Sequence, residues 1–193
     1  MDIKSKKAIV FGGTSGIGLA TCLELQARGA NVVSVSRNPT KAGNSIDGTC
    51  LAAVDARDSN AVSAFFETQG KIDILISSAT GGSRAFGPFL EMEIDGFKGS
   101  FDKLWGYSNV VRYGAPKLSD NGTIVLVSGT PARKMKPGQV ALSAVGGAVE
   151  ALARAIAPEI APRRINVVAP GIVDTPMVAL TGDDRVKHYR NVT

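Results

Sequence analysis

A cluster of glycines near the N-terminus has the residue types and spacing of a phosphate-binding loop. Gly12, Gly13, Gly16 and Gly18 follow the apolar run 8–11 directly and open a segment of helical period. Glycines let the backbone turn tightly beside an anion, and the N-terminus of the next helix offers free N–H groups and partial positive charge. The spacing Gly-x-x-x-Gly-x-Gly between a strand and a helix therefore predicts a dinucleotide pyrophosphate site. The residues expected to form it are Gly12, Thr14, Ser15, Gly16, Ile17 and Gly18.

The end of the next apolar run, 31–36, indicates which dinucleotide this site prefers. NAD sites usually carry Asp or Glu at this point to bind the ribose hydroxyls. Here the run ends at Ser36 and continues with Arg37, so no carboxylate repels a 2′-phosphate. A guanidinium pairs with a phosphate through several donors. We therefore expect Ser36 and Arg37 to favour NADP(H); the alternative is that Arg37 is only a solvated loop cation.

Short apolar runs alternate with longer segments of helical period along the whole chain. Several of the runs are apolar without alternation, which is typical of strands buried on both faces of a parallel sheet. We expect strands at 8–11, 31–36, 51–54, 73–78, 123–128 and 165–169, and helices at 16–28, 60–68, 97–118 and 140–160. This order predicts one α/β domain over residues 1–193, a Rossmann-type doubly wound parallel sheet with right-handed crossovers.

Composition excludes several classes of function. The 193 residues are 44% hydrophobic, which argues against disorder and suits one domain with a core. The net charge is +5, but basic residues are scattered among acids without a stripe of Lys, Arg and aromatic residues, so we expect no nucleic-acid partner. A modest positive charge also suits a site that receives a polyanionic cofactor.

Cysteine usage and hydropathy bear on the compartment. Cys22 and Cys50 form neither a metal motif nor a disulfide framework, so we expect reduced thiols, no metal and a cytoplasmic location. No apolar run is expected to reach the length of a membrane span. Residues 1–7 are charged and lead directly into the first strand, unlike a signal peptide. We therefore expect no membrane association.

Four stretches resemble the short-chain dehydrogenase/reductase family. Residues 11–18 are similar to its cofactor motif, 54–56 to its adenine-contacting segment, 72–80 to its Asn-Asn-Ala-Gly stretch and 164–176 to the segment after its sixth strand. The resemblance implies an oxidoreductase in which residues 170–173 border the nicotinamide and Thr175 contacts the carboxamide. The further cofactor residues that it implies are Asp55, Ala56, Ser78, Ala79, Thr80, Pro170, Gly171, Val173 and Thr175.

The resemblance breaks at the catalytic residues, which in the family are Asn, Ser, Tyr and Lys. Residues 140–150 align with the helix that carries Tyr and Lys, so Leu142 takes the Tyr place and Gly146 the Lys place. Neither side chain transfers a proton or carries charge. This pattern resembles a divergent branch of the family that lacks the Tyr-x-x-x-Lys motif. Lys103 falls in the Asn place, and the Ser place falls on Ser128 or on the neighbouring glycine.

Lys103 and Ser128 are therefore the candidate catalytic residues. The Lys103 ammonium is suited to stabilising an alkoxide or binding ribose hydroxyls, and burial beside a cofactor would move its pKa towards neutrality. The Ser128 hydroxyl is suited to a substrate carbonyl. The alternative for Lys103 is a lysine on the solvent-facing side of a helix. The alternative for Ser128 is a hydroxyl at a strand end that is already hydrogen-bonded within the protein. Tyr107, four residues after Lys103, either replaces the missing Tyr or packs in a helix interface, and Arg84 is placed to meet an acidic substrate.

Three functions follow from these observations. The first is an NADPH-dependent oxidoreductase that acts on a carbonyl or alcohol group of a small molecule with an atypical proton relay. The alternatives are an NADP(H)-binding protein without redox turnover, acting as a sensor or structural subunit, and a non-redox isomerase, lyase or cyclase on the same scaffold. The long helices at 97–118 and 140–160 pair across subunits in the family, which implies a homodimer or homotetramer. Because the sequence ends at Thr193, we expect the domain to lack the family's usual last strand.

Overall fold

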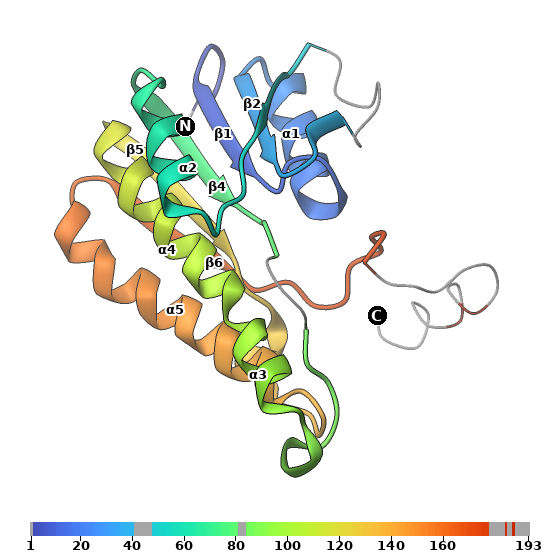
Figure 1. The fold of residues 1–193 in the computed structure, drawn as a ribbon. Helices are drawn as coiled ribbons and strands as arrows, with labels where there is room; N and C mark the ends of the chain where they lie inside the picture. The colour runs from blue at the N-terminus through green and yellow to red at the C-terminus, as the bar shows by residue number, and fades with distance from the viewer. Residues whose placement is uncertain (1, 41–47, 81–83, 178–183, 185–186, 188–193) are drawn as a thin grey trace.

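A computed structural model describes residues 2–40, 48–80, 84–177, 184 and 187, and its described strands form a six-stranded, wholly parallel sheet in the order β3-β2-β1-β4-β5-β6 (Figure 1). The strands are β1 (Lys7–Phe11), β2 (Asn31–Ser36), β3 (Cys50–Ala53), β4 (Ile72–Ser77), β5 (Leu118–Val127) and β6 (Arg164–Val168). The helices are α1 (Gly16–Ala27), α2 (Ser59–Glu67), α3 (Ile94–Ser100), α4 (Asp102–Gly114) and α5 (Val140–Ile160). The predicted Rossmann-type fold is confirmed.

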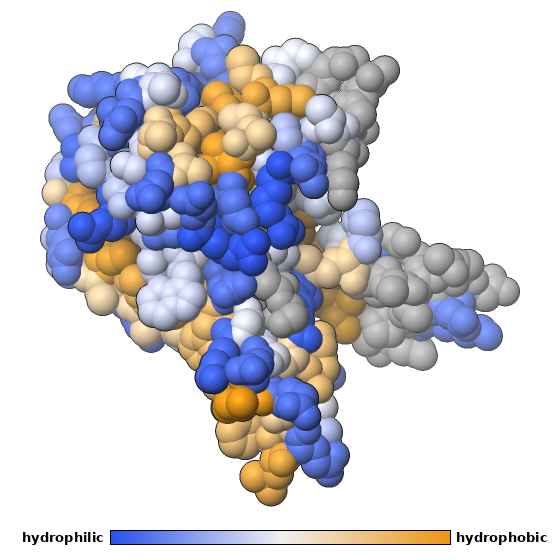
Figure 2. Space-filling model, in the orientation of Figure 1, coloured by the Kyte–Doolittle hydropathy of each residue, from blue (hydrophilic) through white to orange (hydrophobic). Residues whose placement is uncertain are grey.

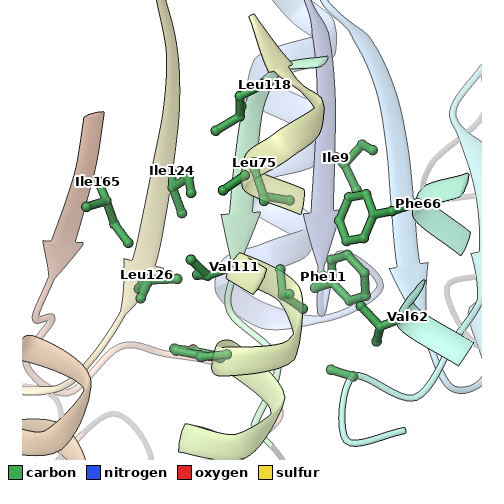
Figure 3. Close-up of a cluster of buried hydrophobic side chains, with 14 of the residues drawn as sticks. Ile9, Phe11, Val62, Phe66, Leu75, Val111, Leu118, Ile124, Leu126 and Ile165 are labelled. Atoms are coloured by element: carbon green, nitrogen blue, oxygen red, sulfur yellow. The ribbon is translucent and has the colours of Figure 1, made fainter. Parts of the chain in front are cut away.

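The sheet is buried on both faces by different helices. Along β1, Ile9 and Phe11 belong to the cluster under α2, α4 and α5, whereas Ala8 and Val10 belong to the cluster under α1. Figure 1 shows α1 on the opposite side of the sheet from α2, α4 and α5. Figure 3 shows the larger of the two clusters, where Ile9, Phe11 and Phe66 pack together. Alternate residues of one strand thus enter two cores, which explains why residues 8–11 of β1 are apolar without alternation.

The strand order reverses beside β1, and this reversal creates the place for a site. The chain goes from β1 outward to β2 and β3, then returns to β4 on the other side of β1. The loops that leave the carboxyl ends of β1 and β4 therefore diverge and open a crevice between them, where ligands bind in open α/β sheets. The segments that follow all six described strands lie at this same edge.

The predicted helix 97–118 was wrong in its extent. The structure instead has α3, then α4, then a 3₁₀ turn over Ala115–Lys117, and β5 already begins at Leu118. The first break lies at Phe101, whose N–H bonds to the Lys98 carbonyl in a tight turn. The second lies at Pro116, which has no N–H to continue an α-helix. Leu118 is then buried beside β4, which starts the strand early.

The expectation that no apolar run reaches membrane-span length was wrong for α5. By length and composition this helix is apolar enough to cross a membrane. It packs on β6 and α4, however, and its Glu150 is buried in ion-pair contact with Arg133. Core helices of water-soluble proteins meet the same criterion, so the finding is weak evidence for a membrane.

Exposed apolar side chains gather near α3, where Figure 2 shows them at the projecting lower end of the molecule. They include Phe89, Leu90 and Ile94, and Leu90 is almost fully exposed. This apolar end belongs to the segment between β4 and α4, away from the glycine loop.

Two helical glycines allow a matched test of core packing. A Cβ on Gly114 would overlap Leu75 and lie 2.8 Å from the Phe66 ring, whereas a Cβ on Gly147 would meet nothing within 4 Å. We expect Gly114→Ala to lower the free energy of unfolding by about 1–3 kcal/mol through overpacking. The control Gly147→Ala is expected to raise it by up to about 1 kcal/mol, because alanine favours helix. Urea unfolding measures both, and equal effects of the two variants would contradict the packing described.

Candidate functional site

The β1–α1 turn packs directly against the end of β4. Gly12 has a φ of +81°, and a Cβ on it would lie 2.6 Å from the Ala79 nitrogen. A Cβ on Gly18 would overlap the Gly12 carbonyl oxygen. Ser15 offers no side-chain cap to α1, so the first N–H groups of the helix are left for another acceptor. The turn therefore presents an uncapped helix N-terminus to the crevice, which is the arrangement that binds phosphate.

A cavity of about 450 Å³ lies beside this turn and is lined from the ends of β1, β2, β3 and β4. Its lining includes Gly12, Thr14, Ser15, Ser36, Arg37, Asp55, Ala56, Ser78, Ala79 and Thr80. These ten residues, predicted from separate stretches of the sequence, thus surround one hollow. Its position and glycine-lined wall fit a dinucleotide.

The remaining predicted cofactor residues lie mainly around a second hollow. This one has a volume of about 690 Å³, is mostly apolar, and is lined by Gly16, Ile17, Pro170, Val173 and Thr175. The two hollows meet at the glycine loop, since a Cβ on Gly16 would lie 3.2 Å from the Thr175 side chain. Gly18 lies behind the loop, and Gly171 is exposed and lines neither hollow. The larger hollow lies on the α1 side of the sheet, so we place the dinucleotide site at the smaller one.

An ion-pair network that sequence reasoning missed borders the first hollow. Arg57 forms ion pairs with Asp55 at 2.7 Å and with Asp102 at 3.2 Å. The hydrogen bond from Arg57 lowers the pKa of Asp55, and the charge of Arg37 adds to this shift. The Asp55 carboxylate is therefore already paired with Arg57. Among the described residues, no carboxylate lies within ion-pair distance of Arg37, which stands exposed at the rim. The spacing Asp55-x-Arg57 was the signal available in the sequence.

Lys103 points from α4 towards the end of β5 and is partly buried. Its ammonium donates to the Ser128 carbonyl oxygen at 3.3 Å and lies 5.4 Å from the centre of the Tyr107 ring. Burial, together with the nearby charge of Arg84, lowers the pKa of Lys103 from 10.5 to about 8. The side chain is therefore not a solvent-facing helix lysine. With a pKa of about 8, its amine gains and loses a proton close to neutral pH.

Ser128 forms hydrogen bonds with both α4 and α5. Its hydroxyl, in a residue only 7% exposed, donates to the Gly146 carbonyl oxygen at 3.2 Å, while its own carbonyl accepts from Lys103. In this arrangement the hydroxyl accepts further hydrogen bonds but has no proton left for a carbonyl oxygen. Gly129 follows in an extended conformation without a side chain.

No side chain fits at Gly146, the position that aligns with the family's Lys. A Cβ there would lie 2.8 Å from Ala132 Cβ and 3.1 Å from Ser128 Oγ. Close contact between α5 and the end of β5 therefore takes the space that a lysine would need. The positive charge in this part of the site enters from α4 instead.

The Tyr107 hydroxyl is hydrogen-bonded to the protein backbone and does not face a ligand site. It is 1% exposed, and its hydroxyl donates to the Val127 carbonyl oxygen at 2.9 Å. Burial raises the pKa of Tyr107 far above its ordinary value. These contacts favour packing over proton transfer for this residue.

The segment after β4 and the segment after β6 contact each other at Arg84. Its guanidinium contacts the sulfur of Met177, which joins the segment after β4 to the segment after β6. Met177 also lines the first hollow. The loop residues 81–83 and most of 178–193 lie outside the described residues. Within the described ranges, no group of three His, Cys, Asp or Glu side chains is placed to hold a metal.

Comparison with known proteins identifies relatives over nearly the whole chain. The short chain dehydrogenase family model matches residues 6–186. L-xylulose reductase of Mesocricetus auratus is 30% identical over 186 residues, which cover 92% of this chain and 75% of that protein. The crystal structure of BdcA in complex with NADPH has a TM-score of 0.84 at 26% identity and covers 97% of this chain and 79% of its own. A short chain dehydrogenase from Burkholderia cenocepacia J2315 in complex with NADP has a TM-score of 0.84 at 26% identity, covering 93% and 77%.

The low pKa of Lys103 predicts a pH effect on stability. Because the pKa is about 8 in the folded protein and 10.5 ordinarily, the unfolded chain binds more protons between these values. The contribution of Lys103 to the free energy of unfolding therefore rises with pH across this window. We expect Lys103→Met to remove that rise, so wild type gains stability relative to the variant from pH 8 to pH 10. Urea unfolding at several pH values measures this, and parallel curves for the two proteins would contradict the burial of the ammonium.

Proposed function

The chain belongs to the short-chain dehydrogenase family of oxidoreductases, and we propose that it uses NADP(H) to interconvert a carbonyl and an alcohol on a small molecule, with Lys103 as its acid and base. The observation that carries the proposal is the position of the Lys103 ammonium. It lies at the end of β5, on the carboxyl edge of the same sheet as the glycine loop, with its pKa lowered to about 8.

The cofactor part of the proposal rests on the first hollow. The uncapped N-terminus of α1 is suited to the pyrophosphate, and Arg37 to the 2′-phosphate. Asp55 and Ala56 would border the adenine, and Ser78, Ala79 and Thr80 would line the middle of the cleft. The nicotinamide end would extend past the point where the two hollows meet, at Gly16 and Thr175, so that Pro170, Gly171, Val173 and Thr175 would lie along it. Structural neighbours solved with NADPH and with NADP support this choice of dinucleotide.

Lys103 would handle the proton in the reaction. The chemistry that NADPH would supply when bound is a hydride for the carbonyl carbon. As the C=O bond opens, the Lys103 ammonium donates its proton to the oxygen, leaving a neutral amine and an alcohol; oxidation reverses both transfers. A pKa near the working pH suits this role in either direction. The Ser128 carbonyl would position the amine, and the Ser128 hydroxyl would accept a hydrogen bond from the alcohol.

A second candidate function is favoured by the loss of the family's catalytic pair. Leu142 and Gly146 stand where the family has Tyr and Lys, and Gly146 has no space for a longer side chain. A protein that binds NADP(H) without turning it over, as a sensor or structural subunit, would need neither residue. A homodimer or homotetramer built on α4 and α5 stays a prediction under both functions.

The choice of dinucleotide is tested by Arg37→Ala. Removing the guanidinium is expected to weaken NADPH binding about 10- to 100-fold, the loss typical of hydrogen bonds to a charged group. NADH, which has no 2′-phosphate, is expected to change less than about 3-fold. Titration followed by nicotinamide fluorescence gives both values of Kd. Arg112→Ala, an exposed arginine on α4, controls for the change in net charge. Equal losses for NADPH and NADH would reject Arg37 as the phosphate ligand.

The role of Lys103 is tested by NADPH oxidation with a panel of aldehydes, ketones and oxo acids. For any compound that is reduced, we expect Lys103→Met to lower kcat about 100-fold or more, as loss of a general acid does. Lys98→Met removes an exposed lysine of α3 and serves as the matched control. Unchanged kcat in Lys103→Met would contradict the proposed relay. Tight NADPH binding without oxidation by any compound would favour the second candidate function.

A further inference from the structure

Two cations of the site, Lys103 at the end of β5 and Arg84 in the segment after β4, have no acidic partner within the described part of the chain. Among the described residues, Lys103 has a backbone carbonyl as its acceptor and Arg84 has the neutral sulfur of Met177. Burial lowers the pKa of Lys103, and the charge of Arg84 adds to this shift. Neither cation forms an ion pair with any described carboxylate.

The carboxylate beside Lys103 on α4 and the buried one on the neighbouring helix α5 are already paired. Asp102, beside Lys103 on α4, binds Arg57. Glu150, the buried carboxylate on α5, binds Arg133 and Arg154. A partly buried ammonium next to a second cation is unfavourable until a counter-charge arrives. The binding of an anion between the two would relieve both the repulsion and the burial cost.

The cofactor's phosphates do not supply this counter-charge. The cavity at the glycine loop is lined by Thr14, Ser15 and Arg37, and neither Arg84 nor Lys103 is among its lining residues. The phosphate-binding features and the Arg84–Lys103 pair thus occupy different parts of the cleft. An anion between Arg84 and Lys103 must therefore come with the second ligand, the substrate.

We propose that the substrate is a carbonyl compound that carries a carboxylate close to the reacting carbon, with the carboxylate bound by Arg84 and the carbonyl oxygen facing Lys103. This inference rests on the proposed function. A guanidinium has a planar fork of donors that matches a carboxylate, and Arg84 stands at the rim, where it meets a ligand entering from solvent. The carboxylate would displace only a contact with the Met177 thioether.

The test compares acids with their neutral esters. Phenylglyoxylate and levulinate are assayed with NADPH beside their methyl esters, for wild type and for Arg84→Gln. In wild type we expect kcat/KM to favour each acid over its ester at least 10-fold. In Arg84→Gln that preference is expected to disappear, because KM rises for the acids more than for the esters. Lys134→Gln, an exposed lysine in the segment before α5, is the charge-matched control.

A binding measurement separates this inference from the proposed function. Calorimetric titration with benzoate, with and without NADPH, is expected to give binding that weakens at least 10-fold in Arg84→Gln, and thermal unfolding checks that the variant is folded. Benzoate binding that depends on Arg84, without reduction of any acid or ester, would support the anion site and overturn the proposed function. Esters reduced as well as acids, with benzoate binding unchanged in Arg84→Gln, would overturn the anion site and leave the proposed function standing.

Discussion

The close approach of the β1–α1 turn to the end of β4 is the constraint on which the site depends. Neither Gly12 nor Gly18 has space for a Cβ, because the backbone at Ala79 and the carbonyl of Gly12 occupy it. Ser78 strengthens the contact, since its hydroxyl donates to the Phe11 carbonyl oxygen at 3.1 Å. This packing holds the N-terminus of α1 at the point where the strand order reverses. The crevice there is consequently both open and lined by unpaired N–H groups.

The packing around Ser128 is a second constraint, and it determines which helix carries the positively charged side chain of the site. Ser128 joins the end of β5 to α5 through its hydroxyl and to α4 through its carbonyl. Ala132, in the turn after β5, and the Ser128 hydroxyl leave no space for a side chain on Gly146, and the Ser128 carbonyl anchors Lys103 from the opposite helix. Where the family resemblance would place Tyr and Lys on α5, this chain has Leu142 and Gly146, and an amine of lowered pKa comes from α4. The further inference extends this reasoning, since neither this amine nor Arg84 is paired with a carboxylate of the described residues.

Local sequence patterns predicted the sheet and the glycine loop, because these depend on periodicity and on backbone freedom at glycine. Of the ten predicted residues around one hollow, five followed from the glycine loop and the end of β2, and five from the family resemblance. The helix 97–118 was predicted too long because its apolar period continues across Phe101 and the break depends on packing. Arg57 was missed because its role depends on Asp102, which is distant in sequence. The burial of Lys103 and the proximity of Arg84 also arise from tertiary contacts. Sequence placed Lys103 in the site by alignment, but its pKa follows only from its surroundings.

A crystal structure of the protein grown with NADPH tests the central claim most directly, because it locates the cofactor relative to Lys103. The predicted result has the pyrophosphate at the N–H groups of residues 14–18 and the 2′-phosphate at Arg37. The Lys103 ammonium should then lie within hydrogen-bond reach, about 3 Å, of the nicotinamide ribose or face the space beside the reactive carbon. A cofactor bound with Lys103 directed away from the nicotinamide, or seated in the α1-side hollow instead, would contradict it.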